Sequence, residues 1–117
     1  MSRERTLKTV LVVVGLLFVA MAYPLVAMHI GEAEQMMLSV YVTLGIFLLV
    51  AARNPAAHRS LIAFAGWSSL AHASVMSVQS VYDAAERVHF LAGVALFAVI
   101  GIAILALSPA KSKAAEA

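Results

Sequence analysis

The chain contains no cysteine and carries little charge. Without cysteine it can form no disulfide framework, no thiolate metal site and no cysteine nucleophile. Only 12% of the residues are charged, about half the fraction of an ordinary soluble domain. The sequence also lacks a glycine-rich phosphate loop, a Gly-x-Ser-x-Gly nucleophile elbow and a His-Glu-x-x-His motif. These absences exclude the common soluble enzyme classes, and we assign no catalytic residue.

The chain is instead rich in apolar residues, which make up 63% of its 117 positions. Short polar joints separate four apolar stretches, each close to the roughly 20 helical residues that cross a bilayer core about 30 Å thick. The stretches are Val10–Met28, Met36–Ala52, Leu61–Val81 and Val88–Leu107. We predict one all-α domain over residues 1–117, a four-helix transmembrane bundle in up-down-up-down order. Its helices are expected at about 9–30, 35–52, 59–81 and 86–107.

Charged residues in the joints predict the orientation of the bundle. The segments before the first stretch, between the second and third, and after the fourth contain Arg3, Arg5, Lys8, Arg53, Arg59, Lys111 and Lys113. The other two joints contain Glu32, Glu34, Asp83 and Glu86, with Arg87 as the one basic residue. Short loops rich in Lys and Arg stay in the cytoplasm, so we predict that both termini are cytoplasmic. The net charge is only +2 and forms no basic face, which argues against nucleic-acid binding.

The joints also contain signals for helix ends. Ala20-Met21-Ala22 resembles a signal-peptide cleavage site, but the apolar run continues to Met28, so we predict that the first span is retained. Pro24 should kink this span. Gly31 is expected to end a helix with positive φ, and Asp83 to cap the start of the fourth helix.

A short echo relates the two halves of the chain. Arg5-Thr6-Leu7 is similar to Arg59-Ser60-Leu61, and Glu32 precedes Glu86 by the same interval. Such an echo fits a duplicated two-helix hairpin with parallel halves. So few matches are close to chance, and no further prediction depends on them.

The third apolar stretch has a polar face. At helical spacing this face contains Leu61, Ala65, Ser69, His72, Met76 and Gln79, with Ser68 beside them. Because it is too polar for lipid, it must face the bundle interior or a partner subunit. Because His72 lies well inside the predicted span, its imidazole needs a hydrogen-bonding partner, either Ser69 or a group on a neighbouring helix. Tyr41 shows no pattern that suggests a special role.

Three histidines and two carboxylates belong to the predicted outer half of the bundle. His29 lies one helical turn before Glu32, and His89 one turn after Glu86, a spacing used in carboxylate metal sites of helical bundles. Together with His72 they predict a pocket for a transition metal, copper or iron. A second form is haem b held by His72 with His29 or His89. The structural alternative is that the carboxylates favour helix starts and that His29 and His89 lie at the headgroup boundary.

Three elements of the second and third stretches carry a family resemblance. They are Tyr41-Val-Thr-Leu-Gly-Ile-Phe-Leu-Leu-Val-Ala-Ala-Arg-Asn-Pro55, His58-Arg-Ser-Leu-Ile62 and Trp67-Ser-Ser-Leu-Ala-His-Ala73. The chain resembles a family of small bacterial four-span membrane proteins of unknown function, and the Trp-Ser-Ser-x-x-His element is the most specific part. The resemblance implies a location in the bacterial inner membrane. It implies no activity, cofactor or catalytic residue.

Three functions fit these observations. The one we favour is a non-enzymatic membrane component, either a homo-oligomeric bundle or an accessory subunit of a larger membrane complex. The second is a redox protein that binds metal or haem through the outer-half histidines. The third is a small transporter or channel in which the polar face of the third span lines a path. The sequence leaves the ligand and the number of subunits open.

Overall fold

The computed structural model describes residues 2–109, so the predicted cytoplasmic Lys111 and Lys113 lie outside the described residues. The helices are α1 (Arg3–Ala20), α2 (Ala22–Ala27), α3 (Glu32–Ala51), the 3-10 helix η1 (Pro55–His58), α4 (Arg59–Tyr82) and α5 (Arg87–Leu107). Four segments are long and apolar enough to cross a membrane: Arg3–Ala27, Glu32–Ala51, Pro55–Tyr82 and Arg87–Leu107. The prediction of an all-α protein with four such helices is therefore confirmed.

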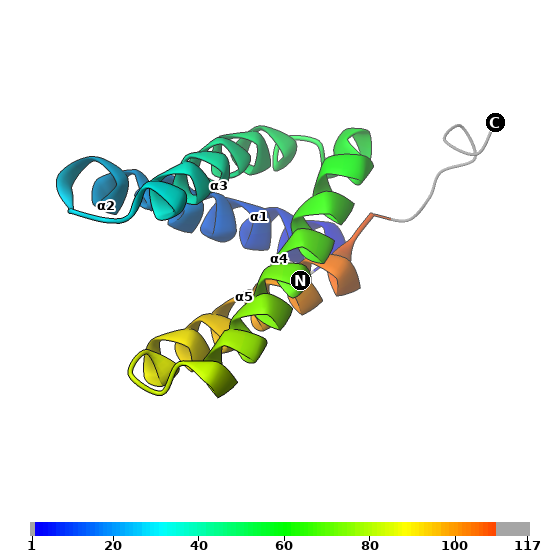
Figure 1. Ribbon diagram of the computed structural model, residues 1–117. Coiled ribbons are helices and arrows are strands. Elements are labelled where there is room, and N and C mark those ends of the chain that lie inside the picture. Colours follow the sequence, from blue (N-terminus) through cyan, green and yellow to red (C-terminus); the bar gives the residue numbers. More distant parts are fainter. Residues whose placement is uncertain (1, 110–117) are drawn as a thin grey trace.

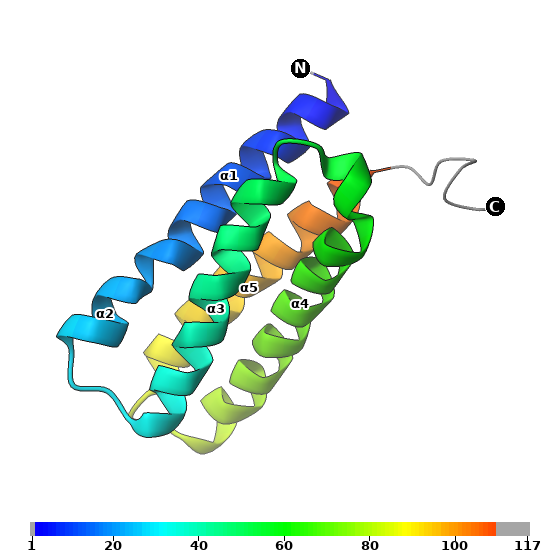
Figure 2. The ribbon, with the colours of Figure 1, turned by 90° about the horizontal axis from the view of Figure 1, so that it is seen from above.

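The helices lie side by side and define two ends of the molecule (Figure 2). At one end lie the start of α1, the 3-10 helix η1 and the last turn of α5; we call this the basic end, after Arg3, Arg53 and Arg59. At the other lie the joint from α2 to α3 and the turn from α4 to α5; we call this the acidic end, after Glu32 and Glu86. The basic residues of one set of joints and the acidic residues of the other thus lie at opposite ends of the long axis of the molecule, which is 49 Å in extent.

Arginines bind carbonyl groups at the C-terminal end of α5. Arg3 donates to the carbonyl oxygens of Ala106 and Ser108, and the second of these distances is 2.8 Å. Arg59 donates to the carbonyl of Pro109 at 3.2 Å. The last carbonyls of a helix need such donors, and cations there also interact well with the helix dipole. The end of α5 is therefore held by side chains from α1 and α4.

The joints follow the sequence signals only in part. The helix breaks between Ala20 and Ala22, because Pro24 has no N–H and its ring crowds the carbonyl of Ala20. Two expectations were wrong. Gly31 is the N-cap of α3 with φ −64°, so it needs no positive φ. Asp83 is the C-cap of α4, and α5 begins later, at Arg87, although Asp83 Oδ1 still accepts a hydrogen bond from the N–H of Glu86.

The four long helices form two hairpins, α1 with α3 and α4 with α5, which pack more extensively within themselves than with each other. The buried positions of the two hairpins follow the same spacing. On α1 and α4 the matching pairs are Leu11 and Ile62, Val14 and Ala65, Gly15 and Gly66, and Phe18 and Ser69. On α3 and α5 they are Tyr41 and Phe97, Leu44 and Ile100, Gly45 and Gly101, and Leu48 and Ile104. The structure is therefore a repeated hairpin, although the sequence echo does not share this register.

Glycines allow the two helices of each hairpin to approach closely. A Cβ on Gly45 would lie 2.7 Å from the carbonyl oxygen of Gly15, and one on Gly101 would lie 2.9 Å from that of Gly66. Small residues of this kind stabilise helix pairs in lipid, where apolar side chains gain nothing by leaving one apolar medium for another. Each hairpin is consequently a close-packed unit.

We predict that Gly45→Ala destabilises the fold by about 1–3 kcal/mol, because the new methyl group meets the backbone of α1 rather than a flexible side chain. The measurement is the free energy of unfolding in detergent micelles. Gly31→Ala is the matched control, since nothing lies within 4 Å of its Cβ position. Gly31→Ala should change the free energy of unfolding by no more than about 0.5 kcal/mol. Alanine stabilises the fold by lowering the entropy of the unfolded chain, but it is a poorer N-cap than glycine, and the two effects oppose each other. Equal effects of the two substitutions would contradict this account of the packing.

Candidate functional site

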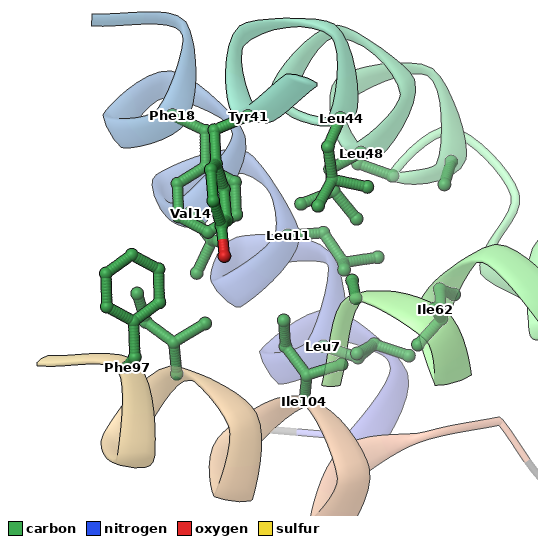
Figure 3. Packing of buried hydrophobic residues seen from close by; sticks show 14 of the residues in the cluster. Leu7, Leu11, Val14, Phe18, Tyr41, Leu44, Leu48, Ile62, Phe97 and Ile104 are labelled. Carbon is green, nitrogen blue, oxygen red and sulfur yellow. The ribbon is translucent and has the colours of Figure 1, made fainter. Parts of the chain in front are cut away.

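Four aromatic rings, one from each long helix, meet in the interior. Phe18 of α1 lies edge-on to Tyr41 of α3, with ring centroids 5.1 Å apart. Phe97 of α5 contacts three of its neighbours, at 6.1 Å from Phe18, 5.5 Å from Tyr41 and 4.1 Å from His72 of α4. Figure 3 shows Phe18, Tyr41 and Phe97 approaching one another from their helices. We call these four residues the ring cluster.

A hydrogen bond of 2.9 Å joins Oη of Tyr41 and Nδ1 of His72 across the two hairpins. A phenol is a stronger donor than a neutral imidazole N–H, and an unprotonated imidazole nitrogen is a stronger acceptor than a phenol oxygen. We therefore assign the hydrogen to Tyr41, which donates while Nδ1 accepts. In the neutral imidazole the proton then lies on Nε2. Nε2 makes no hydrogen bond within residues 2–109 and remains available to another molecule.

The ring cluster divides the interior into a packed half and an open half. Toward the basic end the core is continuous and includes five fully buried side chains, Leu7, Leu11, Leu48, Ile62 and Ile104 (Figure 3). Toward the acidic end α2 buries no residue, and the first buried residues of α3 and α5 are Tyr41 and Phe97 themselves. Only α4 continues to bury side chains there. The two hairpins accordingly diverge from the basic end to the acidic end (Figure 1).

A cavity of about 700 Å³ occupies the space between the diverging hairpins. Its polar lining comes from Glu34, Tyr41, Ser68, His72, Gln79 and His89. Its apolar lining includes Pro24, Met37, Val75, Met76 and Phe90. A neighbouring hollow of about 300 Å³ shares Tyr41, His72, Met76 and His89 and reaches Phe97. Tyr41 and His72 thus line both hollows and Phe97 lines the second, and we call these three residues the floor of the cavity.

The floor lies deep in the molecule. His72 is ten residues before the end of α4, and Tyr41 nine residues after the start of α3, which corresponds to about 15 Å along each helix. Half of a hydrocarbon core of about 30 Å is the same distance. A molecule on this floor would therefore lie near the bilayer midplane.

The structure brings together only part of the predicted site. His72 and His89 line the same cavity, as do the predicted stripe residues Ser68, Met76 and Gln79. Ser69 is fully buried, and its hydroxyl donates to the carbonyl of Ala65 at 2.7 Å, so it is not the partner of His72. That partner is Tyr41, on a neighbouring helix.

The remaining predicted ligands lie apart from this cavity. His29 is exposed in the joint between α2 and α3, Glu32 is the exposed first residue of α3, and Glu86 is the exposed N-cap of α5. Within residues 2–109 no three His, Asp or Glu side chains are close enough to hold a metal ion. The predicted five-residue metal set is not assembled in this arrangement, because the one-turn spacing within each pair says nothing about the distance between helices.

Sequence reasoning missed three of the four rings. Phe18 and Phe97 look like any other apolar residue of their spans, and no pattern in the sequence singles them out. Tyr41 carried a usable signal, since a hydroxyl in the middle of an apolar span needs a partner just as an imidazole does. Matching these two mid-span polar residues would have predicted the contact between α3 and α4.

The fold and the cavity define a small multi-pass membrane protein with a cavity open at one end between two helical hairpins. A model of a family of unknown function, DUF6632, matches residues 2–115, nearly the whole sequence, and the chain belongs to that family. This confirms the predicted resemblance to an uncharacterised family. No curated protein and no solved structure matches the chain.

We predict that Tyr41→Phe lowers the free energy of unfolding by about 1 kcal/mol, the contribution of one hydrogen bond between membrane helices. The ring and its packing are kept, so the loss reports on the bond to His72. Tyr82→Phe is the matched control, because that side chain is 85% exposed and should change nothing. A chemical denaturation series in detergent micelles compares the two variants. Identical curves for both would show that the bond adds no stability.

Proposed function

We propose that the protein is a non-enzymatic membrane component that binds a small lipophilic molecule in the cavity between its hairpins. The observation that supports this is the cavity of about 700 Å³ itself, which has the size of a small-molecule site and a floor of aromatic rings. Apolar side chains make up more than half of its lining, and the polar ones provide contacts that could orient a mainly apolar ligand.

The arrangement of Tyr41 and His72 suits recognition better than reaction. The imidazole is held on one edge by the Tyr41 hydroxyl at 2.9 Å and on its face by the Phe97 ring. A side chain fixed in this way presents Nε2 in one direction at little further cost in entropy. Such preorganisation supports a binding role.

The orientation of the protein is part of the proposal. We place the basic end in the cytoplasm of a bacterial cell and the acidic end at the outer surface of the inner membrane, since short basic loops are retained inside. The helices are then antiparallel in sequence order, with both termini cytoplasmic. The cavity consequently opens toward the outer leaflet.

The other hypotheses find less support. Of the three histidines proposed as haem ligands, only His72 and His89 line the cavity. A copper or iron ion would find fewer than three His, Asp or Glu side chains close together within residues 2–109. A transport path would have to pass the ring cluster and the packed core beyond it. Association with further copies or subunits remains compatible with ligand binding, because exposed apolar side chains cover the outer faces of the helices.

The orientation predicts which joints are accessible from outside the cell. The chain has no cysteine, so single cysteines can be introduced at Ala57 and at Ala84, in the joints of opposite ends. A membrane-impermeant maleimide added to intact cells should label Ala84→Cys and leave Ala57→Cys unlabelled until the membrane is opened. The reverse pattern would invert the orientation, and labelling of both would exclude the four-span arrangement.

The cavity predicts saturable binding of a lipophilic probe. Decylbenzene should bind to nanodiscs that contain the protein in excess of its partition into empty nanodiscs, with at most one molecule per chain. Ala71→Phe adds a ring to the wall of the cavity and should weaken this binding roughly ten-fold or more, the effect of losing about 1.4 kcal/mol or more. Ala95→Phe, on an exposed part of α5 outside this cavity, is the matched control and should bind as the natural chain does. No saturable excess in the natural chain would refute the proposed function.

A further inference from the structure

One hydrogen-bond donor at the cavity floor has no partner. With Nδ1 of His72 engaged by Tyr41, the second ring nitrogen, Nε2, carries the proton and makes no hydrogen bond within residues 2–109. The imidazole is half-buried and lines both hollows between the hairpins. A donor at this depth gains more from an acceptor than one in water does, because water does not compete for it. The floor therefore favours a ligand that offers an oxygen acceptor.

The floor also has a shape. Tyr41, His72 and Phe97 line the hollow next to the cavity. The Phe97 ring lies against His72 with the two planes 37° apart, and the Tyr41 ring is nearly perpendicular to His72, at 89°. Planar rings pack favourably on such surfaces in offset or edge-on arrangements. A flat ring is thus the ligand head that fits this floor.

The depth of the floor restricts the polarity of that head. Charged groups and unpaired N–H or O–H donors are costly near the bilayer midplane, which excludes lipid headgroups. A head with carbonyl acceptors and no donors of its own reaches this depth at the lowest cost. The walls of the cavity, which include the partly exposed Met37 of α3 and Val75 of α4, leave an apolar exit for a tail between the hairpins.

Building on the proposed function, we propose that the ligand is a quinone with an apolar tail. Its ring lies on the floor formed by Tyr41, His72 and Phe97, one carbonyl oxygen accepts a hydrogen bond from Nε2–H of His72, and the tail leaves between α3 and α4. Each part of this ligand matches one feature of the cavity: the ring matches the aromatic floor, the carbonyl oxygen the unpartnered donor, and the tail the apolar exit.

The test compares two ligands that have the same tail and a flat six-membered ring, of which only one has carbonyl acceptors. A decyl-substituted benzoquinone and decylbenzene are titrated against the full chain in nanodiscs, with empty nanodiscs as the reference. The natural chain should bind the quinone about three- to ten-fold more tightly, the effect of one hydrogen bond. His72→Phe keeps a ring but removes the donor, so it should abolish this preference for the quinone over decylbenzene. His29→Phe, outside the cavity, should keep the preference.

A second measurement uses the natural chain alone and does not depend on a folded variant. Nitrogen NMR of the His72 ring should show a proton on Nε2, whose resonance shifts with the quinone and not with decylbenzene. Equal affinity for the two ligands, or a proton on Nδ1, would overturn the quinone assignment while binding of decylbenzene still supports the cavity. Failure of both ligands to bind would overturn the proposed function itself.

Discussion

The hydrogen bond between Tyr41 and His72 is the polar contact on which the cavity depends. Within residues 2–109 it is the one hydrogen bond between side chains of different helices. The hydrophobic effect does not drive helices together in lipid, so a polar bond and close packing must do so. This bond joins α3 to α4 near the middle of both helices and marks the point where the two hairpins stop touching. From there toward the acidic end the hairpins separate, and the space between them becomes the cavity.

The shape of the molecule follows from unequal contacts between similar units. Each hairpin is closed by a glycine pair that brings its backbones together, Gly15 with Gly45 and Gly66 with Gly101. Between the hairpins, α1 meets α5 and α3 meets α4 over much smaller areas. At the basic end Arg3 adds hydrogen bonds that tie α1 to the end of α5. The two hairpins are held together at the basic end and lie apart at the acidic end, and the cavity occupies the space between them there (Figure 1).

The sequence predicts the parts of this fold that depend on local chemistry. The four spans follow from length and hydropathy alone, and the helix break near Pro24 follows from the missing N–H of proline. The cap assignments at Gly31 and Asp83 were wrong because they depend on where the chain turns. The helix before Gly31 already ends at Ala27, and α5 begins at Arg87 rather than directly after Asp83. Of the residues that line the cavity, the sequence singled out His72, His89 and the stripe residues Ser68, Met76 and Gln79, but not Tyr41. His29 and Glu86 lie apart from His72 in the joints of the acidic end, and no spacing within one helix reveals distances between helices.

The site lies where the repeated hairpins differ. Their equivalent positions share size and burial over the packed half, such as Leu48 with Ile104. At the ring cluster this likeness ends, because Phe18 of α1 corresponds to the hydroxyl-bearing Ser69 of α4, and Tyr41 of α3 to Phe97 of α5. One turn further, α4 has His72. The floor pairs the phenol of Tyr41 with the imidazole of His72, which has two nitrogens and uses only one of them for this bond. The second nitrogen, Nε2, takes no part in the contact between the hairpins, so it is the group that a ligand can bind.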